Sequence, residues 1–126
     1  MRAIQALAKE GEMRVQEVID GDTIELDDGQ HVRMIGVDAP ETGRPGADEA
    51  TEFVKGKVQG KEVWLESDGD DKDAYGRLRR YVWLQKPTAQ PAGNQICQYM
   101  LNALLLSKGL ARADGKHKYA ALFERL

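Results

Sequence analysis

Short apolar runs separated by turn-forming residues fill the first third of the chain, and this pattern limits the fold more than any other feature of the sequence. Runs that contain β-branched residues cover 13–19, 23–26 and 31–37. Apolar runs of this length, bounded by glycine and aspartate, are typical of β-strands. Asp27-Asp28-Gly29, between the second and third runs, is typical of a hairpin turn. The sequence therefore predicts three successive strands, with a hairpin joining the last two.

The middle of the chain changes from this pattern to helical spacing. Apolar residues recur on one helix face over 47–58, and Gly60 is placed to end that helix. The apolar positions are Ala47, Ala50, Phe53, Val54 and Val58. Two further strands are expected at 63–65 and 78–84, and a second helix at about 96–107. The order of three strands, helix, two strands and helix predicts an α+β fold.

A chain of 126 residues is long enough for one domain with a modest core. We assign residues 12–126 to that domain and residues 1–11 to an N-terminal extension of unknown role. No apolar run approaches the roughly 20 residues that a membrane span requires, so no membrane partner is expected. The net charge of −3 argues against a protein that coats nucleic acid through its overall field. Contact with nucleic acid is therefore expected to depend on local cations and to be weak and transient.

Three short segments combine carboxylates with arginine at the breaks between apolar runs. The first contains Asp20-Gly21-Asp22, the second runs from Arg33 to Glu41, and the third is Asp73-Ala74-Tyr75-Gly76-Arg77. Carboxylates supply the hard oxygen ligands that divalent cations prefer. Guanidinium groups form paired hydrogen bonds with phosphate oxygens. The combination suits a divalent metal beside a phosphate.

In residue type and in order, these segments resemble the thermonuclease family, the staphylococcal-nuclease-like domains. The resemblance extends from about residue 13 to residue 112 and resumes weakly over 119–126. It implies an OB-fold, a five-stranded β-barrel with attached helices. It also implies a third helix at the end of the chain, where an apolar stripe covers only two turns. The stripe consists of Tyr119, Leu122, Phe123 and Leu126. We therefore expect a truncated C-terminal helix, and either a monomer or weak association through that helix.

The family resemblance implies a calcium site. Asp22 and Asp38 fall where the family has its carboxylate ligands. Ala39 stands where a threonine is usual, but the family uses the backbone carbonyl there, so the substitution should spare the ligand. Ca²⁺ accepts several oxygen ligands in irregular geometry, which suits such a set. For Asp20 two interpretations stay open, because it either holds the turn or supports the ligands from behind.

The resemblance also implies the catalytic residues. Glu41 falls where the family has the glutamate that acts as a general base toward the attacking water, or that orients this water. Arg33 and Arg77 fall where the family places two guanidinium groups against the scissile phosphate. Substrate bases stack on aromatic rings in sequence-tolerant nucleases, and Tyr75 is the better candidate for this contact. Tyr119 is the other candidate.

These residues together imply a calcium-dependent, sugar-nonspecific endonuclease that hydrolyses DNA and RNA and leaves 3′-phosphates. The alternative is a non-catalytic OB-fold module that binds nucleic acid or protein. The sequence disfavours this alternative, because a decayed module should have lost at least one of the five residues Asp22, Arg33, Asp38, Glu41 and Arg77, and all are present. A third interpretation is an intact site left inactive by the missing helix. Millimolar Ca²⁺ would fit a secreted or extracytoplasmic protein, but the sequence does not decide the location.

Other charged groups are expected to have structural roles. The acidic run 68–73 lacks the glycine and glutamate that an EF-hand loop needs at fixed positions. Arg79 and Arg80 are expected on a solvated strand face. His31 and His117 lack the spacing of metal ligands, so no zinc site is expected.

Overall fold

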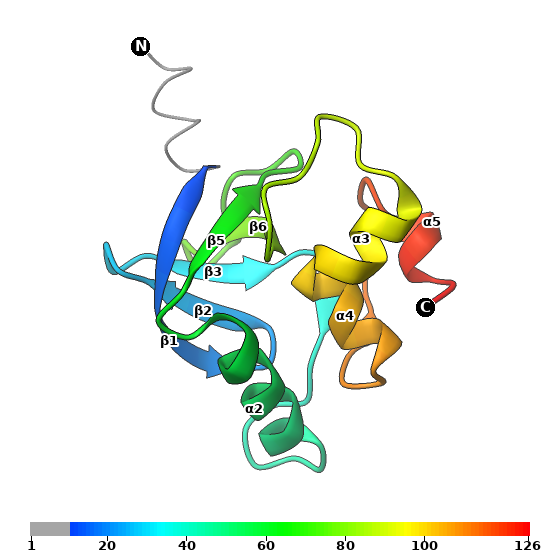
Figure 1. The fold of residues 1–126 in the computed structure, drawn as a ribbon. Coiled ribbons are helices and arrows are strands. Elements are labelled where there is room, and N and C mark those ends of the chain that lie inside the picture. The colour runs from blue at the N-terminus through cyan, green and yellow to red at the C-terminus, as the bar shows by residue number, and fades with distance from the viewer. Residues whose placement is uncertain (1–10) are drawn as a thin grey trace.

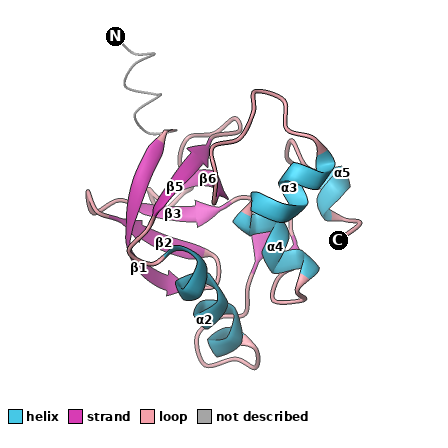
Figure 2. Cartoon of the chain, in the orientation of Figure 1, coloured by secondary structure: helices cyan, strands magenta, loops and turns pink. Residues whose placement is uncertain are grey.

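The computed structural model describes residues 11–126. Apart from Gly11, the predicted N-terminal extension therefore lies outside the described residues. The strands are β1 (Glu12–Asp20), β2 (Thr23–Leu26), β3 (His31–Met34), β4 (Val37–Asp38), β5 (Glu62–Glu66), β6 (Leu78–Trp83) and β7 (Arg112–Ala113). The helices are α2 (Ala47–Val58), α3 (Gly93–Tyr99), α4 (Leu101–Ser107) and α5 (Ala120–Phe123). Strands β1, β2, β3, β5 and β6 gather on one side and α3, α4 and α5 on the other (Figures 1 and 2), which confirms the predicted α+β class.

Five strands form a closed barrel in the order β1-β2-β3-β6-β5. Neighbouring strands are antiparallel except β3 and β6, which run parallel with Val32 beside Leu78. The hairpin between β2 and β3 contains Gly29, whose φ of 89° lies in the left-handed region that favours glycine. The structure therefore confirms both the predicted hairpin and the five-stranded OB-fold barrel.

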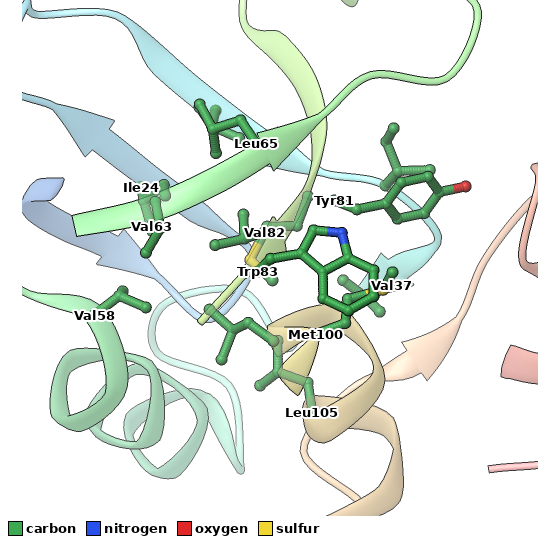
Figure 3. Close-up of a cluster of buried hydrophobic side chains, with 14 of the residues drawn as sticks. Ile24, Val37, Val58, Val63, Leu65, Tyr81, Val82, Trp83, Met100 and Leu105 are labelled. Carbon is green, nitrogen blue, oxygen red and sulfur yellow. The ribbon is translucent and has the colours of Figure 1, made fainter. Parts of the chain in front are cut away.

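One hydrophobic core joins the barrel to the helices. Its largest fully buried side chains include Trp83 and Tyr81 of β6 and Met100 and Leu105 from the helical side (Figure 3). Helix α2 packs against β1, and α4 packs against β6. Burying one large apolar side chain contributes about 1.5–3 kcal/mol to stability. The packed helices and barrel therefore form a rigid support for the segment between β3 and α2.

The predicted strand at 31–37 is interrupted after Met34. The next two residues turn the chain, and Gly36 adopts a φ of 79°. The chain resumes as β4, which leaves the barrel and pairs with β7, so that Asp38 lies beside Arg112. We call this pair the β4–β7 ribbon. The local pattern of apolar residues did not reveal the break, because the partner strand is distant in the sequence.

The predicted helix at 96–107 is divided into α3 and α4. Met100 lies between them in an extended conformation, with φ −96° and ψ 119°. Its backbone pairs with Trp83 of β6 in an isolated bridge, and its side chain is fully buried. A tertiary contact with the barrel therefore holds Met100 out of the helical conformation that its neighbours favour.

The prediction that Arg80 faces solvent is wrong. Arg80 is 1% exposed, and its Nη2 lies 2.6 Å from Asp71 Oδ1. Its Nη1 donates to the backbone oxygens of Asp71 and Arg79. The acidic loop folds back over β6, with Lys72 bridged to Leu78, and covers this guanidinium. Burial of the charge is tolerated because Asp71 and these carbonyls satisfy its donors.

The end of the chain forms α5, a helix of one turn. Tyr119 and Phe123 from the predicted apolar stripe are buried, and both rings contact Tyr81. Leu126 from the same stripe is 37% exposed. Across residues 11–126, no helix has the length and apolar character that crossing a membrane would need.

Candidate active site

Two hollows meet at the β4–β7 ribbon, which contributes residues to both. The first hollow has a volume of about 460 Å³ and is lined by residues 38–41, Arg44 and residues 109–112. The second hollow has a volume of about 250 Å³ and is lined by residues 33–37, Asp73, Arg77, Arg79 and residues 114–117. Two of the three segments that resemble the thermonuclease family, those that contain Arg33 and Arg77, therefore line these hollows.

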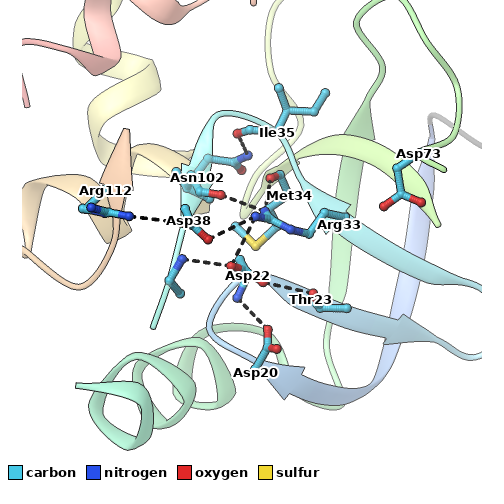
Figure 4. A network of polar contacts seen from close by, with 12 residues as sticks. Asp20, Asp22, Thr23, Arg33, Met34, Ile35, Asp38, Asp73, Asn102 and Arg112 are labelled. Atoms are coloured by element: carbon cyan, nitrogen blue, oxygen red, sulfur yellow. Dashed lines mark hydrogen bonds and ion pairs between the residues drawn. The ribbon is translucent and has the colours of Figure 1, made fainter. Parts of the chain in front are cut away.

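Arg33 lies at the centre of a polar network (Figure 4). Its Nη1 donates to the backbone oxygens of Met34 at 2.8 Å and Val37 at 2.7 Å. Its Nη2 lies 3.4 Å from Asp22 Oδ2 and 3.5 Å from Asp38 Oδ1. These contacts hold the guanidinium at the turn between β3 and β4, where it lines the second hollow.

Asp22 is a buried carboxylate. Its Oδ2 accepts a hydrogen bond from the backbone N–H of Ala39 at 2.9 Å, and its Oδ1 accepts one from Thr23 Oγ1 at 3.0 Å. Burial raises the pKa of Asp22 above its ordinary value, and the hydrogen bond with Asp20 adds to this effect. The positive charge of Arg33 lowers the same pKa but does not outweigh burial. A carboxylate desolvated in this way is stabilised by added positive charge.

Close packing places the turn before Asp22 directly on α2. A Cβ atom at Gly21 would lie 2.7 Å from Ala50 Cβ and 2.8 Å from Ala39 Cβ, so glycine is required there. Asp20 Oδ1 accepts the backbone N–H of Asp22 at 3.1 Å. Of the two interpretations open for Asp20, this contact supports the one in which it holds the turn.

Arg77 reaches the second hollow from the loop before β6. Its Nε donates to Asp73 Oδ2 at 2.7 Å, while Asp73 Oδ1 accepts the backbone N–H groups of Arg77 and Tyr75. Burial acts to raise the pKa of Asp73, but hydrogen bonds from Arg77 and Tyr75 outweigh it and the pKa lies below its ordinary value. Tyr75 is 85% exposed, and its ring centre lies 5.3 Å from the guanidinium carbon of Arg77. Asp73 therefore fixes the cation and leaves the tyrosine free to contact a ligand.

The other predicted residues lie on the opposite side of the ribbon. Asp38, Ala39 and Glu41 line the first hollow, with Glu41 exposed and Ala39 buried. Asp22 is joined to them through the N–H of Ala39. The residues predicted to bind metal or activate water are thus associated with the first hollow, whereas the two arginines predicted to bind phosphate line the second.

Tyr119 lines neither hollow. It is 9% exposed, its hydroxyl donates to Glu66 at 2.8 Å, and its ring packs edge-on against Tyr81. His117 does line the second hollow, and its Nδ1 lies 2.8 Å from the hydroxyl of Tyr81. Burial lowers the pKa of His117, although the negative charge of Asp68 opposes this change.

Asn102 supports the site, although the motifs did not single it out. It is fully buried, its Oδ1 accepts the N–H of Val82 at 2.9 Å, and its Nδ2 donates to the carbonyl of Ile35 at 2.8 Å. It therefore ties the turn after β3, which follows Arg33, to strand β6. A single amide inside the apolar run 100–106 was the available signal.

Arg112 was also missed. Its Nη2 lies 3.6 Å from Asp38 Oδ2, on the side of that carboxylate away from Arg33 (Figure 4). Its side chain is 87% exposed and lines the first hollow. The pairing depends on the β4–β7 ribbon, so nothing near Arg112 in the sequence indicated it.

Comparison with known proteins identifies a family that matches this chain. Residues 31–125 match the family of staphylococcal nuclease homologues. The chain belongs to this family. The match covers Arg33, Asp38, Glu41 and Arg77, and it confirms the resemblance predicted from the sequence.

Individual relatives agree with this assignment. This staphylococcal nuclease homologue is 44% identical to a thermonuclease of Staphylococcus hyicus, over 84% of the chain and 61% of the relative. It is 42% identical to a thermonuclease of Staphylococcus intermedius, over 88% of the chain and 66% of the relative. It is 34% identical to endonuclease YncB of Bacillus subtilis, over 78% of the chain and 46% of the relative. The chain thus spans about three fifths to two thirds of the length of the two thermonucleases.

Proposed function

We propose that this staphylococcal nuclease homologue is a Ca²⁺-dependent, sugar-nonspecific endonuclease that hydrolyses DNA and RNA and leaves 3′-phosphates. The observation that carries the proposal is the placement of Arg33 and Arg77 along one hollow, with Asp22 and Asp38 beside Arg33. The names of the relatives, two thermonucleases and an endonuclease, support it. Phosphate contacts carry no base information, which suits a substrate of any sequence.

Different residues of the chain carry out different parts of the proposed reaction. Arg33 and Arg77 hold the phosphate oxygens and stabilise the charge that develops there. Glu41 orients a water molecule and accepts its proton as the water oxygen forms a bond to phosphorus. The bond from phosphorus to the 5′ oxygen breaks, and this oxygen leaves and takes up a proton to become a 5′-hydroxyl. The phosphate stays on the 3′ oxygen of the other fragment.

The oxygen donors of the site fit a hard divalent cation. Asp22 Oδ2 and Asp38 Oδ1 approach the same nitrogen of Arg33, so the two carboxylates converge. In the part of the chain that the structure describes, no cluster of three or more His, Cys, Asp or Glu residues gathers. The protein would therefore supply Asp22, Asp38 and the carbonyl of Ala39, with water and substrate completing the ligands that Ca²⁺ accepts. When bound, Ca²⁺ would supply neutralising charge at the phosphate.

The proposal is tested by incubating single-stranded DNA and RNA with the chain in millimolar Ca²⁺, in EGTA, and with the variant Glu41→Gln in Ca²⁺. We expect cleavage of both nucleic acids, its loss in EGTA, and a decrease of about 10²-fold or more in rate for the variant. Treatment of the products with a phosphatase, followed by extension with a terminal transferase, determines whether the fragments end in 3′-phosphates.

A different experimental outcome would contradict each part of the proposal. Cleavage that persists in EGTA contradicts the metal requirement. Fragments that extend without phosphatase contradict the bond assignment. A chain that melts cooperatively but cleaves neither nucleic acid contradicts the nuclease itself and favours the non-catalytic binding module.

A further inference from the structure

The first hollow is larger than the arrangement of carboxylates and general base requires. Its volume is about 460 Å³, compared with about 250 Å³ for the second hollow that holds the phosphate-binding arginines. Pro40 and Ala39 line one side, and Leu110 and Ala111 line another. Apolar walls of this kind match the sugar and base of a nucleotide better than they match a phosphate or a water cluster.

Besides Arg33 and Arg77, which were predicted to bind phosphate, the molecule has two further arginines that line the first hollow. Arg44 is exposed on the loop before α2, and Arg112 lies on β7 with its side chain 87% exposed. The partner of Arg112 is Asp38, at 3.6 Å, and Asp38 is shared with Arg33 at 3.5 Å. An exposed ion pair of this length contributes little to stability, so a phosphate can replace Asp38 as the partner of Arg112 at small cost.

The Asp38 carboxylate connects the arginines of the two hollows. Arg33 and Arg77 line the second hollow, and Arg112 and Arg44 line the first, with Asp38 between Arg33 and Arg112. A nucleic acid strand whose phosphate lies at Arg33 would have its neighbouring nucleotide at the ribbon and beyond it. A cationic groove that follows the backbone is how sequence-tolerant proteins bind single strands.

We propose that the first hollow is a nucleotide subsite, in which Arg112 and Arg44 bind the phosphate next to the scissile one and the Pro40 and Leu110 walls contact the intervening sugar and base. The proposal rests on the proposed nuclease function for the identity of the scissile phosphate. It adds a second phosphate contact and a minimum substrate length. Because no aromatic side chain among residues 11–126 lines this hollow, the base there contacts apolar side chains instead of stacking on a ring.

Binding is measured by amide shifts of the ¹⁵N-labelled chain in EDTA, with thymidine 5′-monophosphate and with oligothymidylates of increasing length. We expect the mononucleotide to shift amides around the second hollow, and the longer ligands also to shift amides of residues 109–112. Arg112→Gln should weaken oligonucleotide binding about three- to tenfold. It should also lower the slope of binding against salt by about 0.7, the value for one phosphate contact on a single strand.

Arg125→Gln is the matched control, because Arg125 is an exposed arginine that lines neither hollow and the charge change is the same. In cleavage assays, Arg112→Gln and Arg44→Gln should raise KM with little change in kcat, because the contact is made equally in the ground and transition states. The same variants should leave binding of the mononucleotide unchanged.

The results separate the subsite from the nuclease. A chain that cleaves DNA, but in which Arg112→Gln and Arg44→Gln behave like Arg125→Gln and residues 109–112 do not shift, overturns the subsite alone. A chain that cleaves nothing, but in which residues 109–112 shift with the longer ligands and Arg112→Gln lowers the salt slope, retains the subsite and overturns the nuclease. A chain that cleaves nothing in Ca²⁺ and shows no shifts at residues 109–112 overturns both.

Discussion

At the scale of single residues, the site depends on arginines whose positions are fixed by hydrogen-bond acceptors of the protein itself. Arg33 is held by two carbonyls and two carboxylates, and Arg77 is held by Asp73. A side chain that is already oriented loses little conformational freedom when it binds phosphate. Because Asp73 holds Arg77 through Nε, the Nη groups of Arg77 point in a fixed direction, which the single ammonium group of lysine cannot reproduce.

Arg77→Lys tests this point. The ammonium group keeps the charge but loses both the planar fork and the Nε contact to Asp73, so we expect kcat for DNA cleavage to decrease about 10²-fold. The melting temperature should change little, because the Arg77 side chain is 31% exposed and forms an ion pair that contributes little to stability. Steady-state kinetics and a thermal melt of the same preparation measure both effects. A variant with unchanged kcat would show that Arg77 does not contact the reacting phosphate.

At the scale of elements, the β4–β7 ribbon and the turn before it connect the barrel to the site. The turn is held from one side by Asn102, which reaches the carbonyl of Ile35 and the N–H of Val82. It is packed on the other side by His117, which lies where a side chain at Gly36 would point. The position of Asp38 therefore follows from contacts with two segments that are distant in the sequence.

Replacement of Asn102 by leucine should destabilise the fold. The substitution keeps a similar size but leaves the N–H of Val82 and the carbonyl of Ile35 without their partner, at a cost of about 2–4 kcal/mol. Urea unfolding followed by circular dichroism measures the change. Gln98→Leu is the control on an exposed helical residue, and it should stay within about 0.5 kcal/mol of the parent. Equal effects of the two substitutions would contradict the role given to Asn102.

Gly36→Ala should also destabilise the fold, for a different reason. Gly36 has φ 79°, and a Cβ atom there would lie 2.4 Å from His117 Nε2. Gly29 has φ 89°, but a Cβ atom there would have no atom of residues 11–126 within 4 Å, so Gly29→Ala bears only the backbone strain. We expect about 1 kcal/mol from strain alone and about 1–3 kcal/mol more from the clash. Denaturant midpoints of the two variants give the difference, and equal midpoints would mean that His117 moves aside freely.

The sequence predicted those elements whose cause is local. The strand at 23–26 and the helix at 47–58 follow from the periodicity of their apolar side chains, and the hairpin follows from the ease with which Gly29 adopts a positive φ. The structure has all three elements. The break at Met100 depends on its pairing with Trp83, which no local pattern contains. The same limit applies to the end of β3.

The candidate site follows the same division. The order of the charged motifs was enough to single out Asp22, Arg33 and Asp38, and the structure brings these three together. Their supporting residues were not apparent, because the contacts of Asn102 and Arg112 cross between elements. Arg80 was misjudged for a related reason, since alternation along β6 does not show that a loop will fold over it.

At the scale of the whole molecule, a buried network joins the barrel to the end of the chain. Tyr81 donates to Asp68 Oδ2 at 2.7 Å and contacts His117 at 2.8 Å. Burial and the negative charge of Asp68 raise the pKa of Tyr81, so its hydroxyl stays protonated. Burial acts to raise the pKa of Asp68, but hydrogen bonds from the Lys118 N–H and from Tyr81 outweigh it, and the pKa of Asp68 is lowered. Protonation of His117 or Asp68 would therefore weaken the attachment of the C-terminal segment.

Stability should decrease as the pH falls, in two steps. The pKa of His117 is below its ordinary 6.5 in the folded chain, so the unfolded chain takes up protons first and stability declines as pH falls below about 6.5. The pKa values of Asp68 and Asp73 are both below the ordinary 3.8, so a further loss begins near that pH and continues as pH falls through the folded values. Thermal melts across this range measure the profile.

The variant His117→Gln separates these steps. It should lose the first decline and keep the second, because Asp68 remains. The raised pKa of Asp22 contributes a slope of opposite sign, but parent and variant share it, so their difference cancels it. A variant that follows the parent curve between pH 6.5 and pH 4 would exclude His117 as the group responsible.

The parallel pairing of β3 with β6 is the seam that closes the barrel, and it has a consequence for how activity can arise. Arg33 lies on β3, and Arg77 immediately precedes β6, so the two arginines come from distant parts of the sequence that this pairing brings side by side. A chain cleaved between β5 and β6 would yield two fragments, each with part of the site and neither able to act alone. Under the proposed function, hydrolysis would return only when the fragments recombine across the seam. Partly folded chains would for the same reason be harmless to the nucleic acids around them.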